Sequence, residues 1–181
     1  MKLSILIPSL YKRQILLSSL LAQIANQDTT CLIHTEVITS IDGGVKSIGQ
    51  KRNELLQKAT GDYVVFIDDD DNISKDYLER IFEGINKGVD HIGIAMSVSL
   101  DGKLPKVCLN SKYYVWEEKN NIYYRGVQHV CAIKREIAQA VKYPEINFGE
   151  DKVYSEIITP LINTEHLITE PIYFYNFKSN K

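Results

Sequence analysis

Apolar residues along this chain alternate between short β-rich runs and segments with helical spacing. Runs with the strand pattern cover residues 3–7, 32–41 and 63–67, and apolar residues recur every three or four positions over 14–25 and 47–59. The resulting order is strand, helix, strand, helix, strand, with short connections. This order predicts a parallel sheet with right-handed crossovers, which is the first half of a doubly wound α/β domain.

The second half of the chain has a different pattern. A helix is expected over 74–87 and a strand over 91–100, followed by an aromatic-rich hairpin formed by 112–116 and 122–127. The other expected elements are a strand over 130–134, a short helix over 135–141, a helix that opens at 148–151 and runs to 158, and a last edge strand over 168–174 that contains Pro171. We therefore expect one domain over 1–181, with a mostly parallel half (about 1–100) and a smaller, mixed or antiparallel part (about 101–181).

Composition narrows the class of protein. The 181 residues are 44% hydrophobic and 24% charged, which is typical of one soluble globular domain. The net charge of −2 gives no general attraction to nucleic acid, so a nucleic-acid partner is not expected. The three cysteines are widely spaced, which favours reduced thiols in the cytoplasm over a disulfide framework or structural zinc. No apolar run approaches about 20 residues and no signal peptide is recognised, so no membrane span is expected.

The clearest chemical feature is a run of four aspartates, Asp68 to Asp71, directly after the apolar run 63–67. Adjacent carboxylates repel one another, so they either spread into solvent as an acidic turn or are neutralised by a cation. In an extended segment, Asp68 and Asp70 point the same way and can offer two oxygens to Mg²⁺ or Mn²⁺, while Asp69 points the opposite way. Asp71 could add a water-mediated contact or bind a substrate hydroxyl.

Other charged positions have two interpretations each. Asp42 precedes two glycines at the end of the second expected strand, where it could accept hydrogen bonds from a base or ribose, or form an ordinary Asx turn. The basic segment 51–53 could pair with a diphosphate, or could be a solvated helix face. Glu150 and Asp151 open a helix, where they could supply a general base or act only as N-terminal caps.

Histidines and aromatic residues are further candidates. His129 and His166 could contact a metal or a substrate, and each could equally be structural. Trp116 and the tyrosines beside it in the expected hairpin could stack on sugar rings or pack against one another.

Taken in order, three parts of the sequence resemble the nucleotide-sugar glycosyltransferases of family 2, which have the GT-A fold. Residues 4–9 (SILIPS) resemble the opening strand of that family. Residues 51–53 with 59–71 resemble its long ARN-to-DxDD stretch, and 148–151 (FGED) resemble its later ED motif. The resemblance covers residues 3–155 and has the motifs in the family's order.

The resemblance implies a GT-A-like single domain whose mostly parallel N-terminal half binds the nucleotide sugar and whose smaller C-terminal part binds the acceptor. It implies an inverting, hexosyltransferase-type enzyme that requires Mn²⁺ or Mg²⁺, with a UDP- or GDP-linked sugar as donor and a carbohydrate or other hydroxyl compound as acceptor. Asp68 and Asp70 would reach the metal, and Asp151 would be the base. The residues that would contact the nucleotide are Pro8, Ser9, Asp42, Arg52 and Asp69. The residues assigned to the acceptor or to other contacts are Asp71, His129, Glu150 and Trp116.

The sequence also departs from the family pattern. Residues 9–13 read SLYKR where the family usually has Thr-Tyr-Asn-Arg, so the nucleotide contacts there are open. No Q-x-x-R-W motif is present, which argues against a processive polysaccharide synthase.

Two other classes of protein are compatible with parts of the sequence. A sugar nucleotidyltransferase would need a glycine-rich phosphate loop after the first strand, and residues 8–10 contain no glycine. A non-catalytic protein that binds a nucleotide sugar or a partner would not need intact Asp68, Asp70 and Asp151.

Overall fold

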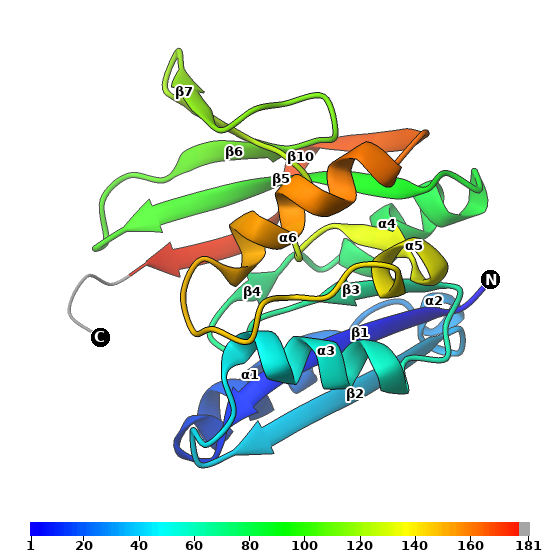
Figure 1. Cartoon of the computed structure of the whole chain (residues 1–181), viewed down its shortest axis with the longest axis vertical. Helices are drawn as coiled ribbons and strands as arrows, with labels where there is room; N and C mark the ends of the chain where they lie inside the picture. Colours follow the sequence, from blue (N-terminus) through cyan, green and yellow to red (C-terminus); the bar gives the residue numbers. More distant parts are fainter. Residues whose placement is uncertain (178–181) are drawn as a thin grey trace.

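The computed structural model describes residues 1–177, which form one sheet with helices on both faces (Figure 1). The elements of the first half are β1 (Leu3–Leu10), the 3-10 helix η1 (Tyr11–Arg13), α1 (Gln14–Ala25), α2 (Thr29–Leu32), β2 (Thr35–Asp42), α3 (Ile48–Lys58), β3 (Tyr63–Phe66), β4 (Asn72–Ile73), α4 (Tyr77–Asn86) and β5 (His91–Leu100). The elements of the second half are β6 (Lys106–Asn110), β7 (Glu117–Lys119), β8 (Ile122–Arg125), β9 (Ala132–Lys134), α5 (Arg135–Gln139), α6 (Glu150–Ile158), the 3-10 helix η2 (Thr159–Leu161) and β10 (Glu165–Phe177).

The first three long strands form the parallel part of the sheet in the order β2-β1-β3. Their register pairs Leu10 with Asp42 and Leu6 with Phe66, so the carboxyl ends of all three strands reach the same edge. The strand–helix–strand order predicted from the hydrophobic pattern is therefore confirmed.

The remaining strands make the sheet mixed. The order continues β9-β5-β6-β8-β7, in which only β6 and β8 run parallel to each other. The last strand, β10, pairs in parallel with β5 and, on its other side, antiparallel with the short β4. A mostly parallel first half with a smaller mixed part is the architecture that the sequence predicted.

Strands β1 and β3 are buried on both faces, and successive residues of β1 point into different layers. In β1, Ile5 and Ile7 share a hydrophobic cluster with residues of α1 and α4, whereas Leu6 belongs to a second cluster with residues of α3, α5 and α6. Figure 1 shows α3, α5 and α6 on the near face of the sheet. Because both faces are covered, the strands read as continuous apolar runs.

Two boundaries in the first half differ from the prediction. We expected the first strand to end before Pro8, but β1 continues to Leu10. Pairing with β3 stops at Leu6, so Pro8 lies beyond the ladder on that side and no β3 hydrogen bond is lost there. The second strand begins at Thr35, later than expected, because the short helix α2 extends to Leu32. Asp28 caps that helix by accepting a hydrogen bond from the Thr30 amide.

The predicted hairpin exists, but its first strand lies later in the chain. Residues 112–116 are not a strand, and the charged segment β7 pairs with β8. Asn120 and Asn121 between them have φ values of 53° and 62°, the left-handed conformation that a tight two-residue hairpin turn requires. Strand β6, which pairs with β5, was not anticipated.

Strand β10 is longer than predicted. Beyond its pairing with β5, its other edge pairs only with the two-residue β4, and Pro171 lies at a register shift, as expected for an edge strand. Within residues 1–177, no helix is both long enough and apolar enough to cross a bilayer.

Candidate active site

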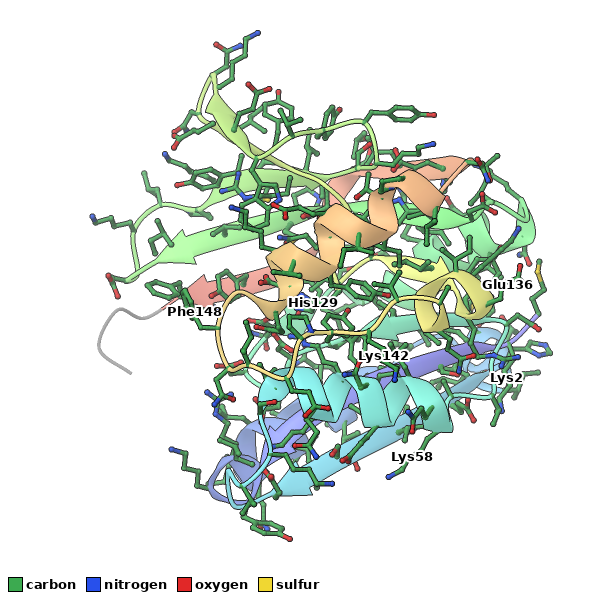
Figure 2. All side chains as sticks on the ribbon, in the orientation of Figure 1. Lys2, Lys58, His129, Glu136, Lys142 and Phe148 are labelled. Atoms are coloured by element: carbon green, nitrogen blue, oxygen red, sulfur yellow. The ribbon has the colours of Figure 1, made fainter. Side chains whose placement is uncertain are left out.

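Polar side chains meet at the carboxyl edge of the parallel strands. Ser9 is at the end of β1, Asp42 ends β2, and the acidic loop, residues 68–71, follows β3. In open α/β sheets this edge is where ligands bind. His129 and the start of α6 come to the same region, and Figure 2 labels His129 between α3 and α6.

Asp68 is held by two cationic or potentially cationic groups. Arg52 Nη2 lies 3.2 Å from Asp68 Oδ1, and His129 Nε2 lies 3.3 Å from Oδ2. Burial opposes ionisation of Asp68, but the charges of Arg52 and His129 outweigh it and hold its pKa well below the usual range. Asp68 is therefore an ionised carboxylate whose side chain stays 28% exposed.

Asp69 and Asp70 share one partner, Arg13 of η1. The Asp69 carboxylate accepts hydrogen bonds from Ser9 Oγ (2.5 Å) and Arg13 Nη1 (2.8 Å), and its side chain is 1% exposed. Asp70 Oδ2 lies 3.5 Å from Arg13 Nη2, and its side chain is 19% exposed. Sequence reasoning missed Arg13, although its position in the SLYKR segment after the first strand was the available signal.

Asp71 is fixed from the other end of the chain. The Tyr173 hydroxyl of β10 donates to Asp71 Oδ2 at 2.6 Å and accepts from the Asp68 amide at 3.2 Å. Asp71 is 5% exposed and Tyr173 is fully buried. Burial, together with the nearby Asp71 and Asp68 carboxylates, raises the pKa of Tyr173 well above its usual value. Tyr173 was not a sequence candidate.

Arg52 lies inside the protein instead of on a solvated helix face. It is 2% exposed, and its guanidinium carbon lies 5.1 Å from the Phe66 ring centroid and 5.7 Å from that of Tyr143. Its Nε lies 3.5 Å from Glu150 Oε1. The solvated-face alternative for the basic segment is therefore wrong, and a diphosphate contact of Arg52 stays a prediction.

Asp42 forms the local turn that the sequence allowed. Its carboxylate accepts hydrogen bonds from the amides of Gly44 (3.0 Å) and Lys46 (2.8 Å) and pairs with the Lys51 ammonium. The hydrogen bond from Lys51 and those from the two amides lower the pKa of Asp42. Lys51 is buried and also donates to the Ser9 carbonyl at 2.6 Å, which ties α3 to the ends of β1 and β2. A base or ribose contact by Asp42, and one by the buried Pro8, stay predictions.

Glu150 and Asp151 begin α6 after Gly149, whose φ of 83° is readily available only to glycine. Glu150 is 6% exposed, and burial raises its pKa despite Arg52 beside it. Asp151 is partly exposed, and its Oδ1 accepts from the Lys152 amide at 2.8 Å. Burial, followed by the charges of Asp71, Asp68, Asp70 and Asp151, raises the pKa of Tyr175 to about 12. Asp151 and the acidic loop therefore lie within electrostatic reach of one side chain.

The other sequence candidates lie apart from this cluster. Trp116 is 44% exposed in the segment before β7, and the Arg125 guanidinium carbon lies 4.7 Å from its ring centroid. His166 Nδ1 lies 3.0 Å from Lys87 Nζ, beside the end of α4. An acceptor contact by Trp116 stays a prediction.

The residues present fit a divalent metal ion that takes only two of its ligands from the protein. Within residues 1–177, no three or more His, Cys, Asp and Glu side chains are grouped so that they could hold a metal ion. Asp68 and Asp70 are partly exposed carboxylates, the hard oxygen ligands that Mg²⁺ and Mn²⁺ prefer. An ion held by this pair would take its other ligands from phosphate oxygens and water, as Mg²⁺ commonly does in nucleotide sites.

Comparison with known proteins identifies the family of this chain. The family model described as "Glycosyl transferase family 2" matches residues 44–134, which contain α3, the acidic loop and His129. A curated protein of Campylobacter jejuni subsp. jejuni serotype O:2, GalNAc(5)-diNAcBac-PP-undecaprenol beta-1,3-glucosyltransferase, is 28% identical over 131 residues. That alignment covers 58% of this chain and 41% of the relative.

Solved structures show the same fold at low sequence identity. The structure of S. aureus TarS 1-349 in complex with UDP-GlcNAc matches with a TM-score of 0.72 and 18% identity, over 100% of this chain and 60% of that one. The mannosyltransferase PcManGT from Pyrobaculum calidifontis, in complex with GDP-Man and Mn²⁺, matches with a TM-score of 0.63 and 13% identity, over 97% and 56% of the two chains. This chain thus spans about two fifths of the curated relative and about three fifths of these structures. The fold is GT-A-like, and the chain belongs to glycosyl transferase family 2.

Proposed function

We propose that this protein is a metal-dependent, inverting hexosyltransferase that moves a sugar from a UDP- or GDP-linked donor to a hydroxyl group of a carbohydrate acceptor. The observation that carries the proposal is the position of Arg52. Its guanidinium contacts Asp68 of the acidic loop on one side and Glu150, beside Asp151, on the other. One buried cation therefore holds the candidate metal ligand and the helix that carries the candidate base at fixed positions.

The names of similar proteins support the donor class. The TarS structure was determined with UDP-GlcNAc and the PcManGT structure with GDP-Man and Mn²⁺, and the curated relative is named a glucosyltransferase. All three names are consistent with a nucleoside-diphosphate sugar as donor for this chain.

The mechanism follows from the chain's own groups. Asp68 and Asp70 would hold a divalent ion, which would stabilise the charge that develops on the leaving diphosphate. Asp151 would take the proton from the acceptor hydroxyl as its oxygen bonds to the anomeric carbon of the donor. The bond from that carbon to the diphosphate oxygen breaks, its electron pair leaves with the diphosphate, and the configuration at the carbon inverts. Arg13 would keep Asp69 and Asp70 in place during this displacement.

The proposal is tested by donor binding with and without metal. Purified protein should be stabilised by one class of UDP- or GDP-sugar in the presence of Mn²⁺ and not in the presence of EDTA, as measured by thermal denaturation. A donor at 100 times its dissociation constant should add about 2.7 kcal/mol.

Variants of the acidic loop show whether the effect comes from the proposed site. Asp68→Asn and Asp70→Asn should each abolish the metal-dependent stabilisation, whereas Asp76→Asn, the same change at an exposed aspartate before α4, should keep it. Stabilisation of both loop variants equal to that of the wild type would remove these residues from the metal site. No stabilisation by any donor would contradict the proposed function.

A further inference from the structure

Tyr173 is a fully buried tyrosine whose hydroxyl contacts two members of the acidic loop. It donates to the Asp71 carboxylate at 2.6 Å and accepts from the Asp68 backbone amide at 3.2 Å. A hydroxyl can donate one hydrogen bond while accepting another, so this side chain uses both capacities within one loop. A phenylalanine would fill the same apolar space without either contact.

The hydroxyl acts on the part of the acidic loop that leads into β10's short partner strand, β4. Within the loop, the Asp71 amide donates to the Asp68 carbonyl at 3.2 Å. The loop then enters β4, where Ile73 pairs with Tyr173. The Ser74 amide donates to the Ile172 carbonyl at 3.0 Å, which fastens the chain after the loop to the same strand. Strand β10 therefore holds the end of the loop with its backbone and the interior of the loop with its tyrosine.

Burial makes the contact hard to replace. Asp71 is 5% exposed, and a buried carboxylate without a hydrogen-bond donor is costly. Removing the hydroxyl would leave Asp71 without this donor and the Asp68 amide without its acceptor. The turn that carries Asp70 would then lose two of the contacts that fix its shape.

We infer that Tyr173 is a positioning residue: its hydroxyl clamps the acidic loop in the shape that presents Asp68 and Asp70 to a metal–diphosphate, and Asp71 serves this clamp. The part of the inference that concerns the metal rests on the proposed function, whereas the clamp itself does not. The sequence alone suggests a water-mediated or substrate contact for Asp71, and the clamp assigns it a different role.

The test compares Tyr173→Phe with Tyr63→Phe. Tyr63 is a matched control, because it is 1% exposed and its hydroxyl donates to the Val89 carbonyl at 2.6 Å. Tyr63 is the first residue of β3, whereas the acidic loop follows the other end of that strand. Both variants lose one buried tyrosine hydroxyl from the same sheet. Hydrogen exchange of the Asp68 amide, measured by NMR in the metal-free protein, reports the clamp directly.

Tyr173→Phe should speed exchange of the Asp68 amide about tenfold or more relative to Tyr63→Phe, because only the first variant removes its acceptor. The same variant should weaken binding of Mn²⁺ in the presence of UDP or GDP by about tenfold, which is the effect of one hydrogen bond to a charged group. Equal exchange in the two variants would overturn the clamp. Faster exchange with unchanged Mn²⁺ affinity would overturn its positioning role.

Changes at Asp71 keep the inference testable if Tyr173→Phe does not fold. Asp71→Asn retains a carbonyl oxygen that can accept from Tyr173, so Asp68 exchange should stay near the wild-type value and Mn²⁺ should still bind. Asp71→Ala removes the carboxylate that orients the Tyr173 hydroxyl but leaves the Asp68 amide its acceptor, so it should weaken Mn²⁺ binding as Tyr173→Phe does while raising Asp68 exchange less than Tyr173→Phe. Loss of Mn²⁺ binding in Asp71→Asn with unchanged exchange would identify Asp71 as a metal ligand and overturn its assignment to the clamp.

If the wild-type protein fails to bind Mn²⁺ in the presence of UDP and also in the presence of GDP, the proposed function is contradicted. The exchange measurement then still decides whether the clamp exists.

Discussion

Arg52 is the residue on which the proposed site most depends. Arg52 is 2% exposed, and burying its charge would be costly without partners. Asp68 and Glu150 lie beside the guanidinium, and two aromatic rings contact its faces. A lysine could not reproduce this arrangement, because the flat guanidinium both stacks on rings and reaches two carboxylates. The same side chain keeps Asp68 ionised, which is the state a metal ligand requires.

Asp151 is the residue whose replacement separates chemistry from binding. Asp151→Asn should lower donor turnover, measured as release of nucleoside diphosphate, by about 10²- to 10⁴-fold because an amide cannot accept the acceptor's proton. Donor affinity should be unchanged, since the proposed metal ligands are Asp68 and Asp70 and the role proposed for Asp151 is to take the acceptor's proton. Glu156→Gln, at an exposed position of the same helix, is the control and should behave as wild type. Turnover by Asp151→Asn near the wild-type rate would mean that another group is the base.

Individual site residues were predictable where the signal lay within one motif. Asp68, Asp70, Arg52 and Asp151 each stand in a short pattern, and the structure brings Arg52 to Asp68 as a shared site requires. Tyr173 could not be found this way, because its contact with Asp71 spans 102 residues and depends on the register of β10.

At the scale of elements, Glu36 fastens the amino ends of the three parallel strands, opposite the site. Its carboxylate, on β2, accepts hydrogen bonds from Ser4 of β1 and Lys2 before it. It also accepts from the amides of Thr60 and Gly61, which lead into β3. The Glu36 carboxylate thus helps to fix the register of the three parallel strands, whose opposite ends carry the proposed site.

This contact should be visible as acid sensitivity. Burial acts to raise the pKa of Glu36, but the hydrogen bonds outweigh it and lower the pKa from 4.5 to about 2. The folded state therefore gains stability from this carboxylate above pH 4.5 and loses it as the pH falls from 4.5 to about 2. Glu36→Gln should lower the free energy of unfolding by about 1 kcal/mol at neutral pH, since solvent screens this partly exposed group.

Urea unfolding at a series of pH values measures the effect. The difference between wild type and Glu36→Gln should be largest near neutral pH and should shrink below pH 4.5. A difference that stays constant down to pH 2 would contradict the assigned pKa shift. Glu156→Gln, an exposed carboxylate on α6, again serves as the control.

The bounds of helices and strands were predicted well where burial gives the apolar residues a regular spacing. They were predicted poorly where the conformation of turn residues fixes the position of a strand. The expected bounds 14–25 and 91–100 match α1 and β5. The hairpin was misplaced because aromatic content suggested a strand over 112–116, whereas two asparagines in the left-handed region fix the turn, and thus β7, later in the chain.

At the scale of the whole molecule, α3 is the contact between the two halves of the proposed site. Its Asn53 side chain exchanges two hydrogen bonds of 2.9 Å with the backbone of Tyr143, and the Gly49 amide donates to the Ile146 carbonyl at 3.2 Å. The segment held in this way leads directly to Glu150 and Asp151. The position of the candidate base is therefore set by a helix of the first half of the chain.

Gly49 allows this close approach, because a Cβ there would lie 1.8 Å from the Pro144 carbonyl oxygen. Gly49→Ala should lower the free energy of unfolding by about 1–3 kcal/mol through overpacking and should also slow turnover by displacing the start of α6. Gly43→Ala is the matched control, since its nearest neighbour is a Tyr11 side-chain atom at 3.8 Å. Urea unfolding that shows the two variants to be equally stable would contradict the close-packed crossing.

The hydrogen bond between Tyr173 and Asp71 also has a place in the order of assembly. It joins residues 102 apart in sequence, and such contacts form after local helices and hairpins because closing a long loop costs entropy. During synthesis at about 5–20 residues per second, Asp71 would wait about 5–20 seconds for Tyr173 to be added. The loop that carries the proposed metal ligands therefore reaches its final shape only after strand β10 has been made.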